Sequence, residues 1–390
     1  MIVRGTLALS LLLSGACAVN HRPNTTVAAL QNDADVARRT ERVTRDSVIA
    51  RLVRRARARG DGKLDVLMLS GGGQNGAFGV GFLRGWRERP DAPMPRFDLV
   101  TGISTGAVQA PYALLGTAAA IDTITALYRR AAERIAPTVD WWFWLRRSGG
   151  VVNTKRFDRA LEQSISGRFR DELHRAFAED RQLVFGTADF DIGTGRTWSL
   201  GDALDTGAVG LVRARTLLKA ATAIPGIFPP VVVDGHVHAD GGVIANVMDV
   251  LQYADYERLA TQLAAAGMRD VTIRVFTIMN MWAQPDVRVM SASSVRKIAG
   301  RSNELLFITH QPETLAQLSN LARAVTGGIP GLRVDFRVAL LPAVLSMEPG
   351  ARKLFDRAFM QRLEELGFAK SRSASPWDSV PSAYERPPRN

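Results

Sequence analysis

Residues 64–76 read Leu64-Asp65-Val66-Leu67-Met68-Leu69-Ser70-Gly71-Gly72-Gly73-Gln74-Asn75-Gly76, an apolar run followed at once by a glycine-rich loop. A helical pattern starts at Ala77, so the stretch predicts a buried strand, a tight turn and a helix. Consecutive glycines permit positive φ angles and let the backbone approach a bound group closely. Because several N–H groups would then face one space beside a helix N-terminus, the loop predicts a site that stabilises negative charge.

A second loop of the same kind follows at Gly102-Ile103-Ser104-Thr105-Gly106, after the residues Phe97-Asp98-Leu99-Val100. It also predicts strand, turn and helix, and a G-x-S-x-G turn holds its serine exposed at the apex. Ser104 is therefore the candidate nucleophile, with Gly102 and Gly106 supporting its loop. A nucleophile beside an anion cradle indicates acyl transfer through an oxyanion.

The pattern after Lys63 alternates apolar runs with helical stretches, which predicts an α/β fold with a mainly parallel central sheet covered on both faces, a three-layer sandwich. A chain of 390 residues, 46% of them hydrophobic, can bury a large core. The expected strands are residues 64–69, 98–101, 183–188, 198–200, 231–233, 271–279 and 334–340. The expected helices are residues 77–88, 105–115, 118–135, 154–164, 217–223, 250–266, 291–308, 314–325 and 351–366.

The first eighteen residues have the pattern of an export signal: Arg4, an apolar run over 7–13, and small residues over 14–18. Cleavage after Ala18 would give a secreted protein. Residues 13–17 instead resemble a bacterial lipobox, although Ser14 stands where leucine is usual. Cys17 is the only cysteine of the chain, so we favour lipidation of Cys17 and a lipoprotein anchored to a membrane, facing the periplasm or at the outer membrane.

The net charge of +12 suits anionic lipid, nucleic acid or an acidic partner, and export argues against nucleic acid. We expect no obligate protein partner. Residues 19–60 are predicted to form a polar tether and, from Asp35, a basic helix. Its apolar positions are Val36, Val43, Ile49, Leu52, Val53 and Ala56. Such a helix either lies on an anionic membrane or packs by its apolar stripe on the main domain, and we favour packing.

The main domain is predicted over 61–370, with a core over 64–280 and a helical C-terminal extension over 281–370. Residues 371–390 are rich in Ser, Pro and Arg and predict a disordered tail. An aromatic cluster at 141–145 is either the lining of an acyl cleft or a core plug under a loop, and both interpretations stay open.

The serine needs a proton acceptor within hydrogen-bond reach. Asp234-Gly235 lies between two alternating runs and predicts a hairpin turn, so Asp234 belongs to the turn. The return strand ends at Asp240, and Gly241-Gly242 frees the backbone there. Asp240 is therefore the expected active-site carboxylate.

The five histidines give weaker candidates for a base or a metal site. His21, His174 and His310 have no motif around them. His236 and His238 share a strand face with Asp240 and suggest a metal set, but paired strand histidines are more often polar-face residues. We expect no metal and no cofactor.

The glycine-rich loop, the G-x-S-x-G turn and Asp240-Gly241-Gly242 occur in the order found in patatin-like phospholipases, which the chain resembles over about residues 64–250. The proline-rich block 221–230 and Asn246 add to the likeness. These phospholipases are serine acyl hydrolases with a Ser–Asp dyad. The resemblance implies a patatin-like three-layer fold and hydrolysis of phospholipids, lysophospholipids or other long-chain esters at a lipid or membrane surface.

The resemblance also assigns roles. Ser104 becomes the nucleophile and Asp240 the general base, with Gly241 and Gly242 as motif support. The oxyanion hole maps to Gly71, Gly72, Gly73, Gln74, Asn75 and Gly76, with the N–H groups of Gly72, Gly73 and Gln74 as donors. Asn75 departs from the family, which usually has Arg or Lys there, and Thr105 stands where many members have Ala or Gly. Both departures are expected to change rate or substrate preference.

Three other functions stay open. An α/β-hydrolase esterase with a Ser-His-Asp triad would need His310 as its base. An acyltransferase with a G-x-S-x-G serine and a histidine would need a cytosolic carrier protein, which export disfavours. A membrane-anchored lipoprotein scaffold without catalysis is the third.

Overall fold

The computed structural model describes residues 22, 24–140, 148–205, 207–285, 287 and 289–381. The predicted export signal, Cys17 and the aromatic cluster at 141–145 lie outside the described residues.

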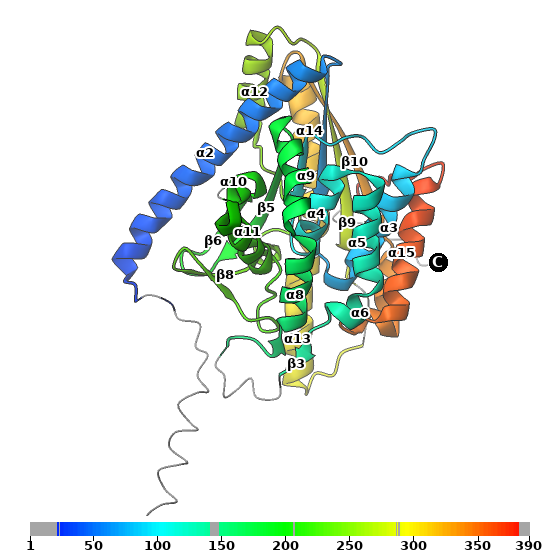
Figure 1. The fold of residues 1–390 in the computed structure, drawn as a ribbon. Coiled ribbons are helices and arrows are strands. Elements are labelled where there is room, and N and C mark those ends of the chain that lie inside the picture. The colour runs from blue at the N-terminus through cyan, green and yellow to red at the C-terminus, as the bar shows by residue number, and fades with distance from the viewer. Residues whose placement is uncertain are drawn as a thin grey trace, which may run out of the picture.

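An eight-stranded sheet runs through the centre of the described chain (Figure 1). Its strands are β1 (Lys63–Leu69), β2 (Leu99–Gly102), β5 (Gln182–Asp189), β6 (Thr194–Ser199), β7 (Val231–Val233), β8 (His236–Asp240), β9 (Val271–Trp282) and β10 (Leu332–Leu341). Their order is β10-β9-β1-β2-β5-β8-β7, with β6 also paired to β5. The pairs from β10 across to β5 are parallel, and the pairs that β5 makes with β6 and β8, and β8 with β7, are antiparallel. The predicted α/β fold with a mainly parallel sheet is confirmed.

Helices cover both faces of this sheet. They are α2 (Val27–Arg59), α3 (Gly76–Arg87), α4 (Thr105–Leu115), α5 (Ala118–Arg129), α6 (Ala131–Arg134), α8 (Lys155–Ser164), α9 (Gly167–Ala178), α10 (Leu200–Leu204), α11 (Gly207–Ala221), α12 (Tyr253–Ala265), α13 (Val295–Ile308), α14 (Gln311–Gly328) and α15 (Arg357–Arg372). Short 3₁₀ turns are η1 (Gly73–Asn75), η2 (Gly241–Val243), η3 (Ala343–Met347) and η4 (Pro349–Arg352). A separate ladder joins β3 (Thr138–Val139) and β4 (Val152–Asn153).

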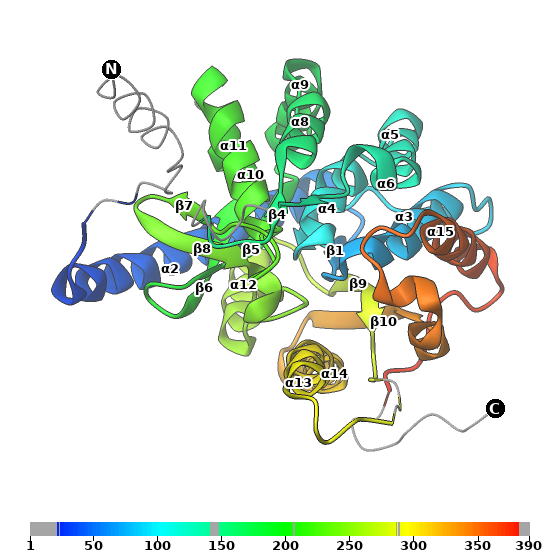
Figure 2. The ribbon, with the colours of Figure 1, turned by 90° about the horizontal axis from the view of Figure 1, so that it is seen from below.

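The two faces of the sheet carry separate cores. Leu67 and Leu69 of β1 pack with α3, α4, α5, α9, α11 and α15, whereas Val66 and Met68 pack with α2, α12 and α14. Figure 2 shows α12, α13 and α14 on the opposite side of the sheet from α3, α5, α8, α9, α11 and α15. This alternation is what a strand buried on both faces produces. The three layers are therefore as predicted.

The long helix α2 begins at Val27, earlier than the predicted Asp35, with Thr26 as its N-cap. Its buried residues include Ile49, Leu52 and Ala56, which join the core on its face of the sheet. Two predicted members of the apolar stripe, Val36 and Val43, are exposed instead. The helix therefore packs on the main domain through its second half. No described helix is both long and apolar enough to cross a membrane.

The C-terminal part differs from the predicted pattern. The expected helix at 351–366 is divided into η4 and α15, with Asp356 capping α15 by accepting from the Phe359 N–H at 3.0 Å. Residues up to 381 are described, and they pack where a disordered tail was expected. The Trp377 ring lies 5.0 Å from that of Trp86, and the Asp378 N–H donates to Val338 O at 2.7 Å. One tryptophan thus anchors a segment whose overall composition predicts disorder.

Candidate active site

The sheet topology brings the two predicted catalytic residues together. Strands β2 and β8 both pair with the edge of β5 that lies opposite β6. β2 runs parallel to β5 and ends with Gly102 opposite Phe185, whereas β8 runs antiparallel and ends with Asp240 opposite Thr187. The two strand ends therefore meet beside Gly186. Ser104 follows β2 by two residues, so it lies at the same point as Asp240.

Ser104 occupies a strained backbone turn between β2 and α4. Its φ of 53° and ψ of −122° are rare for a residue with a side chain. A Cβ on Gly102 would lie 2.6 Å from Gly106 O, so the glycines on either side let the turn close tightly. Strain of this kind is typical of a serine presented for attack, because the turn points its side chain away from the strand that precedes it.

Asp240 is buried at the end of β8. Its Oδ1 accepts from the Gly242 N–H at 2.8 Å, and its own N–H donates to Ala223 O at 2.9 Å. Burial raises the pKa of Asp240 to about 6, and the Ser104 hydroxyl and the Gly242 N–H act in the opposite direction. The hydroxyl lies close enough to affect the carboxyl, yet no hydrogen bond of ordinary geometry joins them, and Oδ2 has no partner among the described residues. Asp240 is thus a stronger base than a solvated aspartate.

The glycine-rich loop keeps three of its six predicted N–H groups available. The other three N–H groups already donate hydrogen bonds. The Gly71 N–H donates to Asn246 O, and those of Asn75 and Gly76 donate to carbonyl oxygens within the loop. Those of Gly72, Gly73 and Gln74 donate to no described backbone oxygen, and the three residues line one cleft with Ser104. Gly73 has a φ of 56°, the conformation for which glycine was predicted. The loop therefore offers three donors beside the serine.

Asn280 on β9 holds this loop in place, and sequence reasoning missed it. Its side-chain Nδ2 donates to Ser70 O at 3.0 Å, and its backbone N–H donates to Ser70 Oγ at 2.7 Å. Its Oδ1 accepts from the Gly79 N–H at 3.1 Å, and the residue is fully buried. A Cβ on Gly72 would collide with the Asn280 backbone. A lone amide inside the apolar run 271–279 and its continuation is the signal that could have drawn attention to it.

Two further amides join the loop to the rest of the site. Asn246 Nδ2 donates to Gly71 O at 3.4 Å and to Gln311 Oε1 at 3.2 Å. Gln74 Nε2 donates to Gly350 O at 3.0 Å, and its Oε1 accepts from the Asp356 N–H at 2.8 Å. The glycine-rich loop is therefore braced by the C-terminal extension. Asn75 is buried, and its Oδ1 has no hydrogen-bond partner among the described residues.

The cleft at Ser104 has a volume of about 770 Å³, and the C-terminal extension builds much of its wall. Apolar side chains from this region include Met281, Trp282 and Ile308. The lining cations all come from the extension and are Lys297, Arg301, Arg352 and Lys353. The cleft thus combines an apolar wall with positive charge, although Asn75 itself supplies none.

His310 lies elsewhere. It is exposed, its Nδ1 lies 3.5 Å from Glu313 Oε2, and it lines a neighbouring cavity of about 640 Å³ instead of the cleft with Ser104. The expected Asp234 turn is present, because Asp234 and Gly235 both have positive φ, and Asp234 pairs with Arg213 at 2.9 Å.

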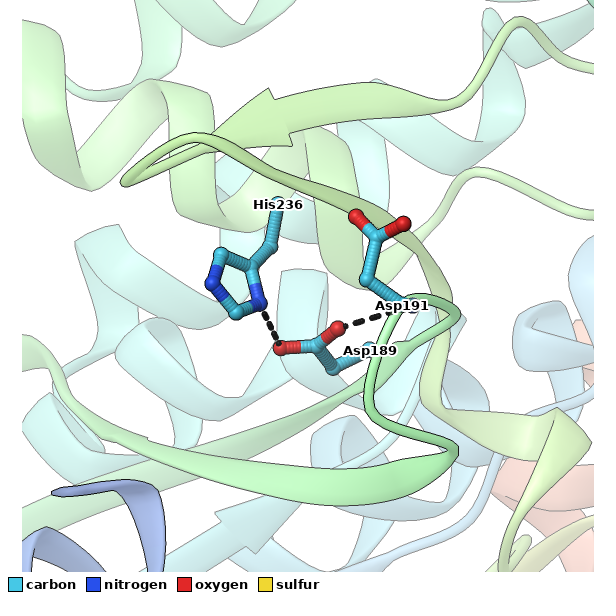
Figure 3. A group of neighbouring side chains, drawn as sticks. All are labelled: Asp189, Asp191 and His236. Atoms are coloured by element: carbon cyan, nitrogen blue, oxygen red, sulfur yellow. Dashed lines mark hydrogen bonds and ion pairs between the residues drawn. The ribbon is translucent and has the colours of Figure 1, made fainter. Parts of the chain in front are cut away.

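The hypothetical set of His236, His238 and Asp240 does not come together. The described group whose potential ligand atoms lie within 4.8 Å of one another is instead Asp189, Asp191 and His236 (Figure 3). His236 Nδ1 lies 2.9 Å from Asp189 Oδ2, and Asp191 pairs with Arg22 at 2.6 Å. These side chains form a polar cluster that does not include Asp240.

Comparison with known proteins agrees with the geometry. Residues 67–248 match the family model described as patatin-like phospholipase, and this span contains the loop, Ser104 and Asp240. No curated protein matches the chain. Among solved structures, VipD from Legionella pneumophila is similar at 14% identity and a TM-score of 0.34, over 79% of this chain and 66% of that chain. Residues 67–248, a little under half of the chain, are therefore similar to patatin-like phospholipases.

Proposed function

We propose that this protein hydrolyses acyl esters of phospholipids or lysophospholipids, with Ser104 as nucleophile and Asp240 as general base. The observation that carries the proposal is the meeting of a strained serine turn with a buried carboxyl whose pKa is raised to about 6. A carboxyl titrating near neutral pH suits a base that must take and return one proton at each step.

The reaction proceeds in two halves. Asp240 takes the hydroxyl proton as Ser104 Oγ attacks the ester carbonyl, and the N–H groups of Gly72, Gly73 and Gln74 donate to the resulting oxyanion. The intermediate collapses when the alcohol leaves with the proton from Asp240, and an acyl-serine remains. Water then attacks the acyl carbon, Asp240 again takes a proton, and the fatty acid leaves as Ser104 regains its own. Each oxyanion donor of this kind contributes roughly 10²–10³ in rate.

The cleft favours an amphiphilic substrate. Met281, Trp282 and Ile308 offer an apolar wall for an acyl chain, while the lining cations suit a phosphate group. Patatin-like phospholipases usually carry Arg or Lys at the position of Asn75. In this chain the cations that line the cleft would supply the positive charge that Asn75 lacks. We therefore favour a phosphate-bearing lipid over a neutral ester.

The test is turnover of a lysophospholipid and of a short soluble ester by three single variants. Ser104→Ala and Asp240→Asn should each lose at least about a thousandfold in kcat. Asp234→Asn is the matched control, since it changes an aspartate of the same hairpin that lies in the turn, and it should keep parental turnover. An active Asp240→Asn enzyme would exclude the dyad.

Replacing His310 tests the triad alternative. Because His310 lines the neighbouring cavity, His310→Ala should change kcat for the soluble ester less than about threefold. A loss as large as that of Ser104→Ala would favour a Ser-His-Asp esterase. Absence of turnover in the parent protein on every ester tested would favour a scaffold function.

A further inference from the structure

Helix α13 has two different faces. Five of its residues line the catalytic cleft: Lys297, Gly300, Arg301, Glu304 and Ile308. Other apolar residues of the helix project into solvent, with Val295 81% exposed, Ile298 47% and Leu306 63%. Helices that pack on a core bury their apolar side chains. One side of α13 therefore walls the cleft while apolar side chains elsewhere on it stay uncovered.

Exposed apolar side chains also line the cleft and the cavity beside it. Val289, Met290 and Leu354 line the cleft and are exposed. Val243 and Ile244 follow the Asp240 motif directly, are exposed, and line the neighbouring cavity that shares Gly242 and Asn246 with the cleft. We call these five residues, with Val295, Ile298 and Leu306, the apolar rim. The exposed apolar side chains beside these two adjoining cavities and on the outer side of α13 together mark an interaction surface.

Positive charge accompanies the apolar rim. Among the described residues, the titratable groups lining the cleft are the cations Lys297, Arg301, Arg352 and Lys353 against Glu304 and Asp240. Arg301 pairs with Glu304 at 3.2 Å, and Lys353 pairs with Asp356 at 3.1 Å. Four cations against two carboxyls thus line the cleft, and this excess of positive charge beside the apolar rim complements a negatively charged surface.

We propose that the apolar rim docks on a lipid bilayer that contains anionic phospholipids, so that substrate enters the cleft from the bilayer. Aliphatic side chains beside Lys and Arg on an exposed helix suit a helix lying in the plane of a membrane interface. A second copy of the chain fits less well, because a symmetric interface would bring the same positive charge against itself. The inference rests on the proposed function for its substrate route, and the docking surface itself is independent of catalysis.

Most of the rim lies outside the residues that match the family model, which end at 248. Val243 and Ile244 fall inside that span, whereas α13, Val289, Met290 and Leu354 belong to the C-terminal extension. The extension would thus give this chain its own means of reaching its substrate.

The test is co-sedimentation of the full chain with phosphatidylcholine vesicles, with and without phosphatidylglycerol. The double variant Val295→Ser/Ile298→Ser changes two exposed residues one helical turn apart on α13. The matched control, Val209→Ser/Val212→Ser, changes two equally spaced residues on α11 that are 72% and 61% exposed. Turnover of a short soluble ester and light scattering are measured on the same samples.

The parent should bind vesicles with phosphatidylglycerol more tightly, and added salt should weaken that binding. The α13 variant should lose roughly tenfold in vesicle affinity, and the control should bind as the parent does. The proposal is overturned if the parent binds neither vesicle, or if the two double variants have the same vesicle affinity. It is also overturned if light scattering shows a dimer in the parent that the α13 variant fails to form. Vesicle binding without any ester turnover would remove the proposed function and leave the docking surface standing.

Discussion

At the level of single residues, the proposed chemistry and its pH dependence both rest on Asp240. A solvated aspartate has a pKa near 3.8 and is a weak base for a serine hydroxyl. Burial at the end of β8 raises the pKa of Asp240 to about 6, because the charged form loses its water. Burial thus makes Asp240 a stronger base, and it also makes the ionised carboxylate unfavourable for the stability of the folded protein.

The ionisation of Asp240 should control how kcat/KM depends on pH. Asp240 must be ionised to accept the proton of Ser104, so kcat/KM for a soluble ester should fall as pH decreases through about 6. Below that value the rate should drop tenfold for each pH unit. An acid limb near pH 4, as for a solvated aspartate, would contradict the raised pKa.

The buried Asp240 carboxyl should also make the free energy of unfolding depend on pH. The folded state binds a proton at Asp240 more tightly than the unfolded chain does. Protonation of Asp240 therefore stabilises the folded state fully below pH 3.8, and this stabilisation is lost as pH rises through about 6. At pH 8 the buried carboxylate is therefore unfavourable, and Asp240→Asn should raise the free energy of unfolding by about 1–3 kcal/mol. Urea titrations at pH 8 and pH 4 measure this. The gain should vanish at pH 4, and a gain equal at both pH values would contradict the explanation.

At the level of elements, the position of the glycine-rich loop depends on β9. Three buried hydrogen bonds tie Asn280 to Ser70 and Gly79. Two of them use the side chain, so Asn280→Ala should lower kcat for the soluble ester by about tenfold or more and destabilise the fold by roughly 1–3 kcal/mol. KM should change less, because Asn280 positions donors that act mainly on the oxyanion.

A matched control is Asn320→Ala, which removes an exposed amide on α14 and should leave both quantities unchanged. If Asn280→Ala lowered stability but kept parental kcat, the side chain would serve the fold alone.

The sequence predicted local elements well where their signals are local. The Asp234-Gly235 turn, the two glycine loops and the strand Lys63–Leu69 all follow from short patterns, and they are enough to nominate Ser104 and Asp240. The contacts of Asn280 and Gln74 could not be predicted in this way. They join segments more than two hundred residues apart and form only when the sheet and the extension pack together.

The division of the predicted helix 351–366 has the same origin. Its helical periodicity is real, but Asp356 caps a new helix, and its N–H is held by Gln74 Oε1. Local propensity does not contain that contact. Likewise, nothing in the composition after residue 370 indicates that Trp377 packs against Trp86.

At the scale of the whole molecule, arginines of α2 connect the N-terminal helix to the start of the central sheet. Arg59 donates to Asp65 at 2.8 Å and also to Asp98, and Arg55 donates to Asp98 at 2.7 Å. Both aspartates are buried. Removing one partner of such a network leaves charge buried with fewer cations around it.

Arg59→Met should therefore lower the free energy of unfolding by about 3–5 kcal/mol. Arg38→Met, which removes an exposed pair with Asp35 on the same helix, should lower it by less than about 1 kcal/mol. Urea unfolding of both variants checks the difference. Equal small effects would mean that α2 is not energetically joined to the sheet.

The observations at every level lead to one proposal, that the fold activates Ser104 through Asp240. The most direct measurement is intact-protein mass spectrometry after incubation with a fluorophosphonate. We expect a single adduct on the peptide that contains Ser104. It should be absent in Ser104→Ala and form far more slowly in Asp240→Asn. No adduct on the parent protein, or one that forms at the parental rate in Asp240→Asn, would contradict it.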